Sequence, residues 1–275
     1  MSSVPALSSA AVAHLAKDVD AIDTIETAIL PGNKAPRGQA VIDSILHQAG
    51  TDIDVTIDGT VTQVQSWSLS RMFDLPGNLK RRGYAIRVPD QPLFPAFFNA
   101  RTVKFHAGLE VGLMNHGLAA FAWVRHKIGF GIPGWLTKAT RRAAQLLAWM
   151  GTNTGGMTVR VVVRVGDQWQ ARTWRLLARE GEGPYIPAIS VRAILRNPDL
   201  SQAGARPGLA VFDLADAEAA MTDLAVETDT QSVDLTPLFP KVLGPAFAQL
   251  DPAVRRSHQI YGVRRLSGTA QITRG

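Results

Sequence analysis

The sequence contains no cysteine among its 275 residues. Disulfides, thiolate metal sites and cysteine nucleophiles are therefore excluded, and a reducing compartment suits the chain. Its first Lys or Arg is Lys17, whereas a secretory signal peptide begins with basic residues before its apolar run. Hydrophobic residues make up 46% of the chain and charged residues 19%, a balance that excludes disorder. We expect a folded cytoplasmic protein of one large domain, or of one domain with a small appendage.

Acidic residues are absent between Glu110 and Asp167, a stretch that contains seven basic residues: Arg125, Lys127, Lys138, Arg141, Arg142, Arg160 and Arg164. The net charge of the chain is +6, so the basic excess is confined to this stretch. It predicts a nearby anion, which could be a phosphate or carboxylate ligand, a membrane surface or an acidic partner. The alternative is that these side chains only face water.

No apolar run is long enough to cross a membrane. The segment 111–124 is nearly uncharged, but fourteen helical residues cover only about 21 Å of a hydrocarbon layer ~30 Å thick. The next predicted helix, 135–150, separates apolar from polar residues: Trp135, Leu136, Ala139, Ala143, Leu146, Leu147 and Met150 against Lys138, Arg141, Arg142 and Gln145. Such a helix can lie in an anionic membrane interface, or it can pack on its own sheet as an ordinary surface helix.

Apolar periodicity and turn residues predict the secondary structure. Strands are expected at 22–30, 84–88 and 101–105, with hairpins at 54–64 and 157–178. Helices are expected at 6–16, capped by Ser8 or Ser9, and at 41–49, 111–124, 135–150, 187–197 and 215–224. The prolines between 89 and 95 exclude a long helix, and the polar run 228–232 predicts a linker. This order indicates an α+β fold with a mainly antiparallel or mixed sheet, flanking helices and a short C-terminal appendage.

The common cofactor and catalytic motifs are missing or misplaced. The string Gly129-Phe130-Gly131-Ile132-Pro133-Gly134 fits the dinucleotide fingerprint, but it follows a predicted helix and lacks the acidic residue about twenty positions later. None of the six histidines forms a pair at i, i+2 or i, i+4, so we expect no metal site. The sequence has no Walker loop and no Gly-x-Ser-x-Gly elbow, and no motif predicts specific binding of nucleic acid.

Several strings, taken in order, resemble the half of bacterial saccharopine dehydrogenase-like oxidoreductases that follows their nucleotide-binding domain. They cover most of residues 2–225: Ser2-Ser3-Val4-Pro5-Ala6-Leu7-Ser8-Ser9, Pro31-Gly32-Asn33-Lys34-Ala35-Pro36-Arg37-Gly38, Val88-Pro89-Asp90, Arg101-Thr102-Val103-Lys104-Phe105-His106-Ala107-Gly108-Leu109-Glu110, Gly155-Gly156-Met157 and Gly183-Pro184-Tyr185-Ile186-Pro187-Ala188. The resemblance implies hydride transfer between NAD or NADP and a C–N or C–O centre. It also implies that this half lines the substrate cleft and supplies dimer contacts. The implied partners are a small anionic substrate and either a second copy of the chain or a separate Rossmann subunit.

The two ends of the chain depart from that family. Strings within residues 238–275, among them Leu243-Gly244-Pro245-Ala246-Phe247, resemble the opening of an uncharacterised domain that often follows the reductase half. The family's Gly-rich phosphate loop does not precede Met1, so the resemblance implies a fragment, a late start or a split gene product. We expect a substrate and dimerisation domain at 1–230 and the start of a second domain at 231–275. NAD or NADP would bind the missing domain, and we expect this chain alone to bind neither.

The matched strings contain candidate substrate-binding residues. Lys34 and Arg37 lie in a loop shaped by glycine and proline, and their two cations suit a carboxylate or phosphate. Alternatively, the loop closes a helix and its charges face water. Asp90, Glu110 and Tyr185 are polar residues inside otherwise apolar strings, and we expect them to contact the substrate.

His106 is the candidate catalytic residue. It lies at a predicted strand end, and the reference pKa of histidine, near 6.5, allows it to carry a proton at neutral pH. A histidine that is satisfied in the core is the alternative. A second function class also stays open: a non-enzymatic protein that uses the basic helix pair around 125–150 to bind a partner or the inner face of the membrane.

Overall fold

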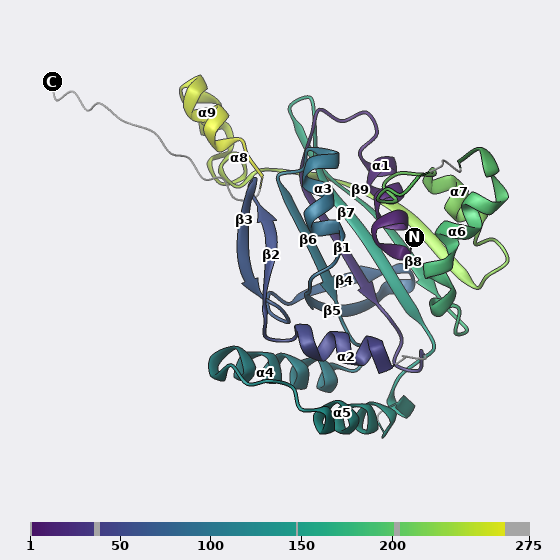
Figure 1. Cartoon of the computed structure of the whole chain (residues 1–275). Helices are drawn as coiled ribbons and strands as arrows, with labels where there is room; N and C mark the ends of the chain where they lie inside the picture. The colour runs from purple at the N-terminus through teal and green to yellow at the C-terminus, as the bar shows by residue number, and fades with distance from the viewer. Residues whose placement is uncertain (1, 36–38, 147, 201–203, 262–275) are drawn as a thin grey trace.

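The computed structural model describes residues 2–35, 39–146, 148–200 and 204–261 (Figure 1). Within them, one nine-stranded sheet has the order β3-β2-β6-β1-β7-β8-β9, and β5 connects the β4–β5 hairpin to β6. β1 and β6 are parallel, whereas the other described pairs are antiparallel. The strands are β1 (Ala21–Leu30), β2 (Asp52–Ile57), β3 (Thr60–Gln65), β4 (Arg71–Leu75), β5 (Leu79–Ala85), β6 (Thr102–Ala107), β7 (Gly155–Val165), β8 (Gln168–Ala178) and β9 (Val226–Leu235).

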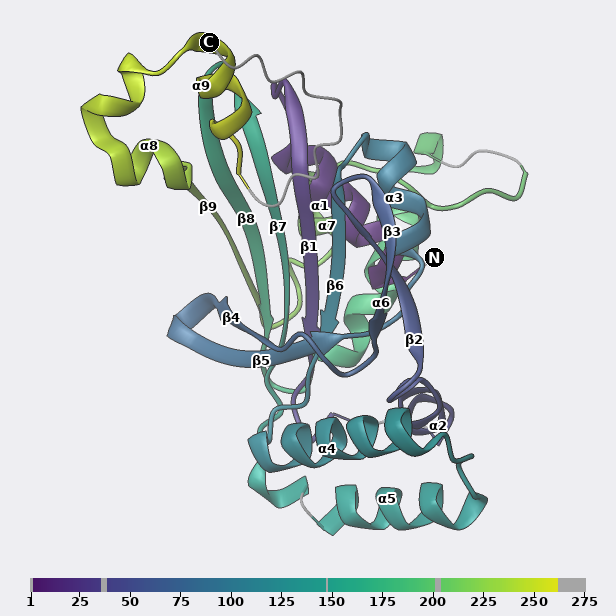
Figure 2. The ribbon, with the colours of Figure 1, turned by 90° about the vertical axis from the view of Figure 1, so that its left-hand side faces the viewer.

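The helices gather on one face of the sheet and at its two ends (Figures 1 and 2). Four lie on the face: α1 (Ser8–Leu15), α3 (Asp90–Phe98), α6 (Ile186–Arg196) and α7 (Leu214–Ala219). Three lie at one end: α2 (Gln39–Gln48), α4 (Gly112–Ile128) and α5 (Gly134–Leu146). Two lie at the other end: α8 (Leu238–Leu243) and α9 (Pro252–His258). The expected α+β class, with a mixed and mostly antiparallel sheet and flanking helices, is confirmed.

The main core lies between the sheet and the four helices on its face. Side chains alternate along a strand, so one set from each strand points to this layer. Ile25, Val103 and Val159 belong to this set and are fully buried against the helices. Trp174 is also fully buried, and its indole Nε1 donates a hydrogen bond to Glu218 at 2.9 Å. The opposite set of side chains points to the other face.

That other face carries the β4–β5 hairpin across one part of its surface (Figure 2). Phe73 and Leu75 of the hairpin pack on Ala28, Leu30 and Leu177 in a small second core. Gly156 permits this contact, since a Cβ atom there would lie 2.6 Å from a methyl carbon of Leu75. The hairpin therefore anchors its first strand, β4, beside the middle of β1.

Most predicted elements are confirmed, but the predicted linker at 228–232 is wrong. Those residues lie in β9, which pairs with β8 from Ala178–Val226 to Trp169–Leu235. The boundary expected between residues 230 and 231 thus falls inside a strand. β9 is an edge strand whose pairing uses backbone groups, and a polar sequence does not reveal that pairing.

One smaller expectation about the helices needs correction, and the proline-rich segment forms a short helix. The hydroxyls of Ser8 and Ser9 do not cap α1, because the chain enters it from a π-helical turn at Ser3–Leu7, and the Ser9 Oγ donates to the carbonyl of Ala6 instead. A nine-residue helix, α3, forms across the proline-rich segment. Pro92 lies in its first turn, where an N–H group would have no partner within the helix.

Candidate functional site

The candidate site lies on the sheet face that the four helices do not cover. Glu26 of β1 pairs in register with Lys104 of β6 and with Arg160 of β7. Register partners point to the same face, so this row places one carboxylate between two cations. His106 is two residues beyond Lys104 on β6 and therefore points to the same face, beside Ala28 of β1. Side chains alternate between the two faces along β1 and β6, and this alternation brings these side chains to one face.

Arg71 brings a third cation to this row from the hairpin. Its Nη1 donates a hydrogen bond to Oε2 of Glu26. The Glu26 side chain is only 3% exposed, whereas that of Arg71 is 45% exposed. The guanidinium also stacks over Phe73, with 5.7 Å between its central carbon and the ring centre. Arg71 therefore closes the site from the solvent side while keeping contact with water.

His106 is buried beside this ion pair. Its Nδ1 lies 3.8 Å from Oε1 of Glu26 and has no hydrogen-bond partner among the described residues. The imidazole packs against Phe73 with 5.1 Å between ring centres. Gly83 makes room for both rings, since a Cβ atom there would lie 3.0 Å from each side chain.

The protonation state of His106 follows from its burial. Burial lowers the pKa of His106, and the negative charge of Glu26 acts against that effect without cancelling it. Arg71 and Lys104 lower the pKa further, because two nearby cations disfavour a third. The imidazole is therefore neutral at pH 7, with one ring nitrogen facing a carboxylate. A neutral imidazole beside a carboxylate and a cationic rim can bind an anionic group and exchange one proton with it.

Glu110 lies in a separate network that joins two loops. Its Oε1 accepts from Arg81 Nη2 at 2.8 Å and from the Thr152 hydroxyl at 2.6 Å, while its Oε2 accepts from the backbone N–H groups of Asn33 and Thr152 at 2.7 Å each. Burial raises the pKa of Glu110, but these hydrogen bonds and the Arg81 charge outweigh it and lower the pKa below its usual value. Both carboxylate oxygens are thus used to hold the protein together.

The two cations predicted in the Pro31–Gly38 loop are only partly described. Lys34 is exposed, and its backbone N–H donates to the carbonyl of Thr152 at 3.1 Å. The Glu110 network therefore fixes the start of this loop. Arg37 lies outside the described residues.

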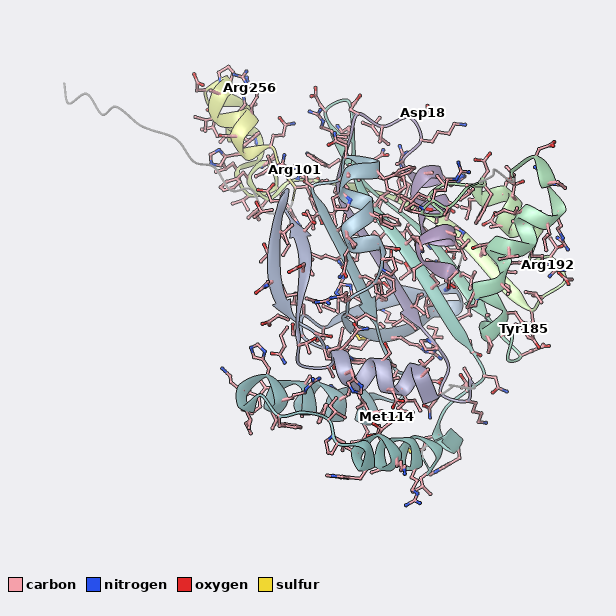
Figure 3. The ribbon with its side chains drawn as sticks, viewed as in Figure 1. Asp18, Arg101, Met114, Tyr185, Arg192 and Arg256 are labelled. Atoms are coloured by element: carbon pink, nitrogen blue, oxygen red, sulfur yellow. The ribbon has the colours of Figure 1, made fainter. Side chains whose placement is uncertain are left out.

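Asp90 and Tyr185 lie away from His106. Asp90 begins α3, on the helical face of the sheet, and it is only 1% exposed. Burial raises the pKa of Asp90 to about 7, an effect that the Ser8 hydroxyl opposes. Neither the Asp90 carboxylate nor that hydroxyl meets hydrogen-bond geometry with a described residue. Tyr185 is 60% exposed in a short 3-10 turn before α6, on the helical side of the molecule (Figure 3).

An open pocket of about 390 Å³ lies elsewhere, on the helical side, and contains none of the predicted site residues. Its lining is Phe97, Arg206, Pro207, Leu209, Ala210 and Val211. We call the set of Glu26, Arg71, Lys104, His106 and Arg160 the His106 row. We favour this row as the functional site because the pocket lacks a buried ionisable group. Among the described residues, no group of three or more His, Asp or Glu could hold a metal ion.

Sequence reasoning found His106 but missed Glu26 and Arg71. Glu26 carries a usable signal, since it is an acid in the middle of an apolar strand, and Lys104 stands in the same matched string as His106. Arg71 gives no such signal, because only the packing of the hairpin brings it to β1. Comparison with known proteins adds no further residue: no family model and no curated protein matches the chain.

Proposed function

We propose that this chain is the substrate-binding and dimerisation part of a saccharopine dehydrogenase-like, NAD(P)-dependent oxidoreductase. One observation carries the proposal: a buried neutral histidine faces a buried carboxylate on the open face of the sheet, and three cations border the pair. A substrate site for such an enzyme needs a proton carrier and charges that hold an anionic group. The resemblance of the surrounding strings supplies the class of reaction.

The described residues do not fit a nicotinamide cofactor. The Gly129–Gly134 run joins α4 to α5, so a helix precedes it where a dinucleotide site has a strand. We therefore assign NAD or NADP to a separate nucleotide-binding domain and derive no step through the cofactor. The open sheet face beside His106 is the surface on which that domain would pack.

The chain itself would bind an anionic substrate and move one proton. Arg71, Lys104 and Arg160 attract a carboxylate or phosphate group of the substrate. Nδ1 of His106 is buried under Arg71, so the substrate reaches it once Arg71 turns from Glu26 to the anionic group. With its own proton on Nε2, His106 then accepts the proton of a substrate hydroxyl or amino group at Nδ1. The Glu26 charge then stabilises the imidazolium, and the proton returns to the substrate in the reverse reaction.

The test isolates the native polypeptide from its own cells with an antibody against this chain. Its N-terminus is determined, and the preparation is assayed for oxidation of NADH and NADPH with small anionic ketones and imines. We expect a nucleotide-binding domain, either joined to the chain or present as a stoichiometric partner, and turnover that His106→Ala reduces at least tenfold. Asp54→Asn, an exposed change on β2, is the matched control and keeps full turnover. The proposal fails if the isolated material binds neither NADH nor NADPH.

A further inference from the structure

The six tryptophans of the chain fall into two sets. Trp67, Trp169 and Trp174 are at most 5% exposed. The other three all lie between positions 123 and 149: Trp123 is 59% exposed, Trp135 68% and Trp149 76%. Tryptophan has a large apolar surface, so three exposed copies in one region mark a surface that contacts something other than water.

α4 carries the first of these tryptophans on an exposed stripe. Leu113, His116, Trp123 and Lys127 are exposed and follow one another at helical spacing, so they share one side of the helix. Asn115 and Ala122 lie on the opposite side and are buried. The exposed stripe therefore combines apolar side chains with a cation.

α5 repeats this arrangement on its exposed side. Trp135, Lys138, Arg142 and Leu146 are exposed and recur at i, i+3, i+7 and i+11, which places them on one side. The buried residue is Thr137, on the other side. This exposure agrees with the expected separation of apolar and basic sides, because Trp135, Lys138, Arg142 and Leu146 lie where the two sides meet. The side chain of Arg141 lies outside the described residues.

The charge of this surface is positive, although not all seven basic residues contribute. Arg125 caps the C-terminal end of α2 instead, since its guanidinium donates hydrogen bonds to the carbonyls of Leu46, His47 and Ala49. Arg160 and Arg164 lie on β7. Among the side chains that the structure describes, the exposed cations of the helix pair are Lys127, Lys138 and Arg142, and the sequence of the two helices contains no acidic residue.

We propose that α4, α5 and the turn at Ala148–Met150 bind the surface of an anionic phospholipid bilayer. Tryptophan prefers the boundary between headgroups and acyl chains, and basic residues are attracted to anionic headgroups. Both kinds lie along the same exposed sides, which suits a helix pair lying flat in that boundary. An acidic protein partner would require a shaped contact, whereas a bilayer accommodates scattered tryptophans. No described helix is long and apolar enough to cross the bilayer.

This surface is distinct from the His106 row. Figures 1 and 2 both place α4 and α5 at one end of the molecule, together with α2, and the hairpin lies between them and the middle of the open sheet face. The proposal therefore stands or falls independently of the proposed enzymatic role.

The test measures sedimentation of the full chain with vesicles of phosphatidylcholine, with and without phosphatidylglycerol. We expect binding only to the anionic vesicles, with release when salt is raised from about 0.1 M to about 1 M, because the screening length falls from about 10 Å to about 3 Å. Lys138→Gln and Arg142→Gln should each weaken binding roughly fivefold. Trp135→Ala should weaken it about tenfold by removing buried apolar area. Brominated acyl chains should quench tryptophan fluorescence of the parent chain.

Two control variants outside the helix pair test whether vesicle binding is specific to α4 and α5. Leu195→Ala on α6 removes an equally exposed apolar side chain, and Lys80→Gln on β5 removes an exposed cation, and both should bind like the parent. The proposal is overturned if the folded chain does not sediment with anionic vesicles at low salt, or if it sediments without tryptophan quenching. It is also overturned if Trp135→Ala instead converts a dimer to a monomer, which would assign the surface to a second copy.

Discussion

The Nδ1 atom of His106 lies 3.8 Å from the Oε1 atom of Glu26, and both side chains are almost fully buried. This distance exceeds that of a hydrogen bond by about 1 Å. Glu26 therefore acts on the imidazole through its charge, while its other oxygen stays bound to Arg71. The two residues lie 80 positions apart in the sequence, and the parallel pairing of β1 with β6 brings them together.

Glu26→Gln should lower the pKa of His106. The carboxylate favours the charged imidazolium, so its removal leaves burial and the two nearby cations opposed only by a backbone hydrogen bond with Leu69. Titration of the imidazole carbon-bound protons by NMR measures the shift. Glu227→Gln is the matched control, because Glu227 is half exposed and paired with Arg179 near the start of β9. An unchanged or raised pKa in Glu26→Gln would contradict the geometry described here.

Asp90→Asn should stabilise the protein at pH 8. Burial raises the pKa of Asp90 to about 7, so between about pH 4 and pH 7 the folded state holds a proton that the unfolded state has lost. The contribution of Asp90 to stability thus falls as the pH rises through this window, by on the order of 4 kcal/mol. Asparagine does not ionise and avoids this loss.

Urea unfolding of the parent and of Asp90→Asn at pH 5 and pH 8 tests this prediction. The difference between the two proteins isolates Asp90, since other titrating groups such as His106 are common to both. Asp54→Asn, on the exposed side of β2, should follow the parent at both values. If Asp90→Asn is no more stable than the parent at pH 8, ionisation of the buried Asp90 carboxyl does not destabilise the folded parent.

The sequence predicted the main sheet because its strands are strongly patterned. The β7–β8 hairpin joins two long runs across a turn at Gly166-Asp167, and its first strand is rich in valine and almost continuously buried, so its pairing could be predicted from composition and the turn. β4 was missed because only five residues form it and its partner contacts come from packing on Leu30 and Leu177. β9 was mistaken for a linker because its side chains are polar on an open edge.

The sequence predicted only those site residues that lie close together in one matched segment. His106 and Lys104 are two residues apart, so they lie on the same face of any β-strand formed by this segment. Arg71 reaches Glu26 through a hairpin that turns back across the sheet, which is a tertiary contact without a local signal. Asp90 was singled out as a polar residue inside an apolar string and as a substrate contact, but it lies in α3 on the opposite side of the sheet from His106.

Glu110→Ala should strongly destabilise the protein. The change leaves the guanidinium of Arg81, which is 4% exposed, without its counter-charge, and it frees two backbone N–H groups in the joined loops. Loss of one partner from a buried ion pair costs about 3–5 kcal/mol. Glu227→Ala breaks an exposed pair with Arg179 and should cost less than about 1 kcal/mol. Urea unfolding at pH 7 compares the two variants. Equal losses in the free energy of unfolding would show that the Glu110 network stabilises the fold no more than a surface contact does.

The pH dependence of Glu110 has the opposite sign to that of Asp90. The pKa of Glu110 is lowered in the folded state, so its contribution to stability is present above its unfolded pKa, near 4.3, and is lost as the pH falls through the folded pKa. The stability difference between the parent and Glu110→Gln should therefore shrink on acidification below about pH 4. A difference that stays constant down to pH 3 would show that Glu110 is not charged in the fold.

Gly108→Ala should displace His106 from its site. A Cβ atom at Gly108 would lie 1.9 Å from the carbonyl oxygen of Arg82, so β5 has to move away from the end of β6. That movement breaks the pairing of Ala85 with His106 and separates the imidazole from Phe73. We expect a loss of about 3 kcal/mol in stability and a changed chemical shift for the His106 ring, because overpacking against backbone cannot be relieved by a side-chain rotation.

Gly131→Ala is the matched control, since a Cβ atom there meets nothing within 4 Å. Alanine at that loop position should leave stability unchanged or raise it slightly, by reducing the entropy of the unfolded chain. Both variants add one methyl group, so any difference between them reports the contact between β5 and β6. If Gly108→Ala unfolds at the same urea concentration as Gly131→Ala and keeps the His106 signal, the close approach of these strands is absent in solution, and the position of His106 beside Glu26 has to depend on another contact.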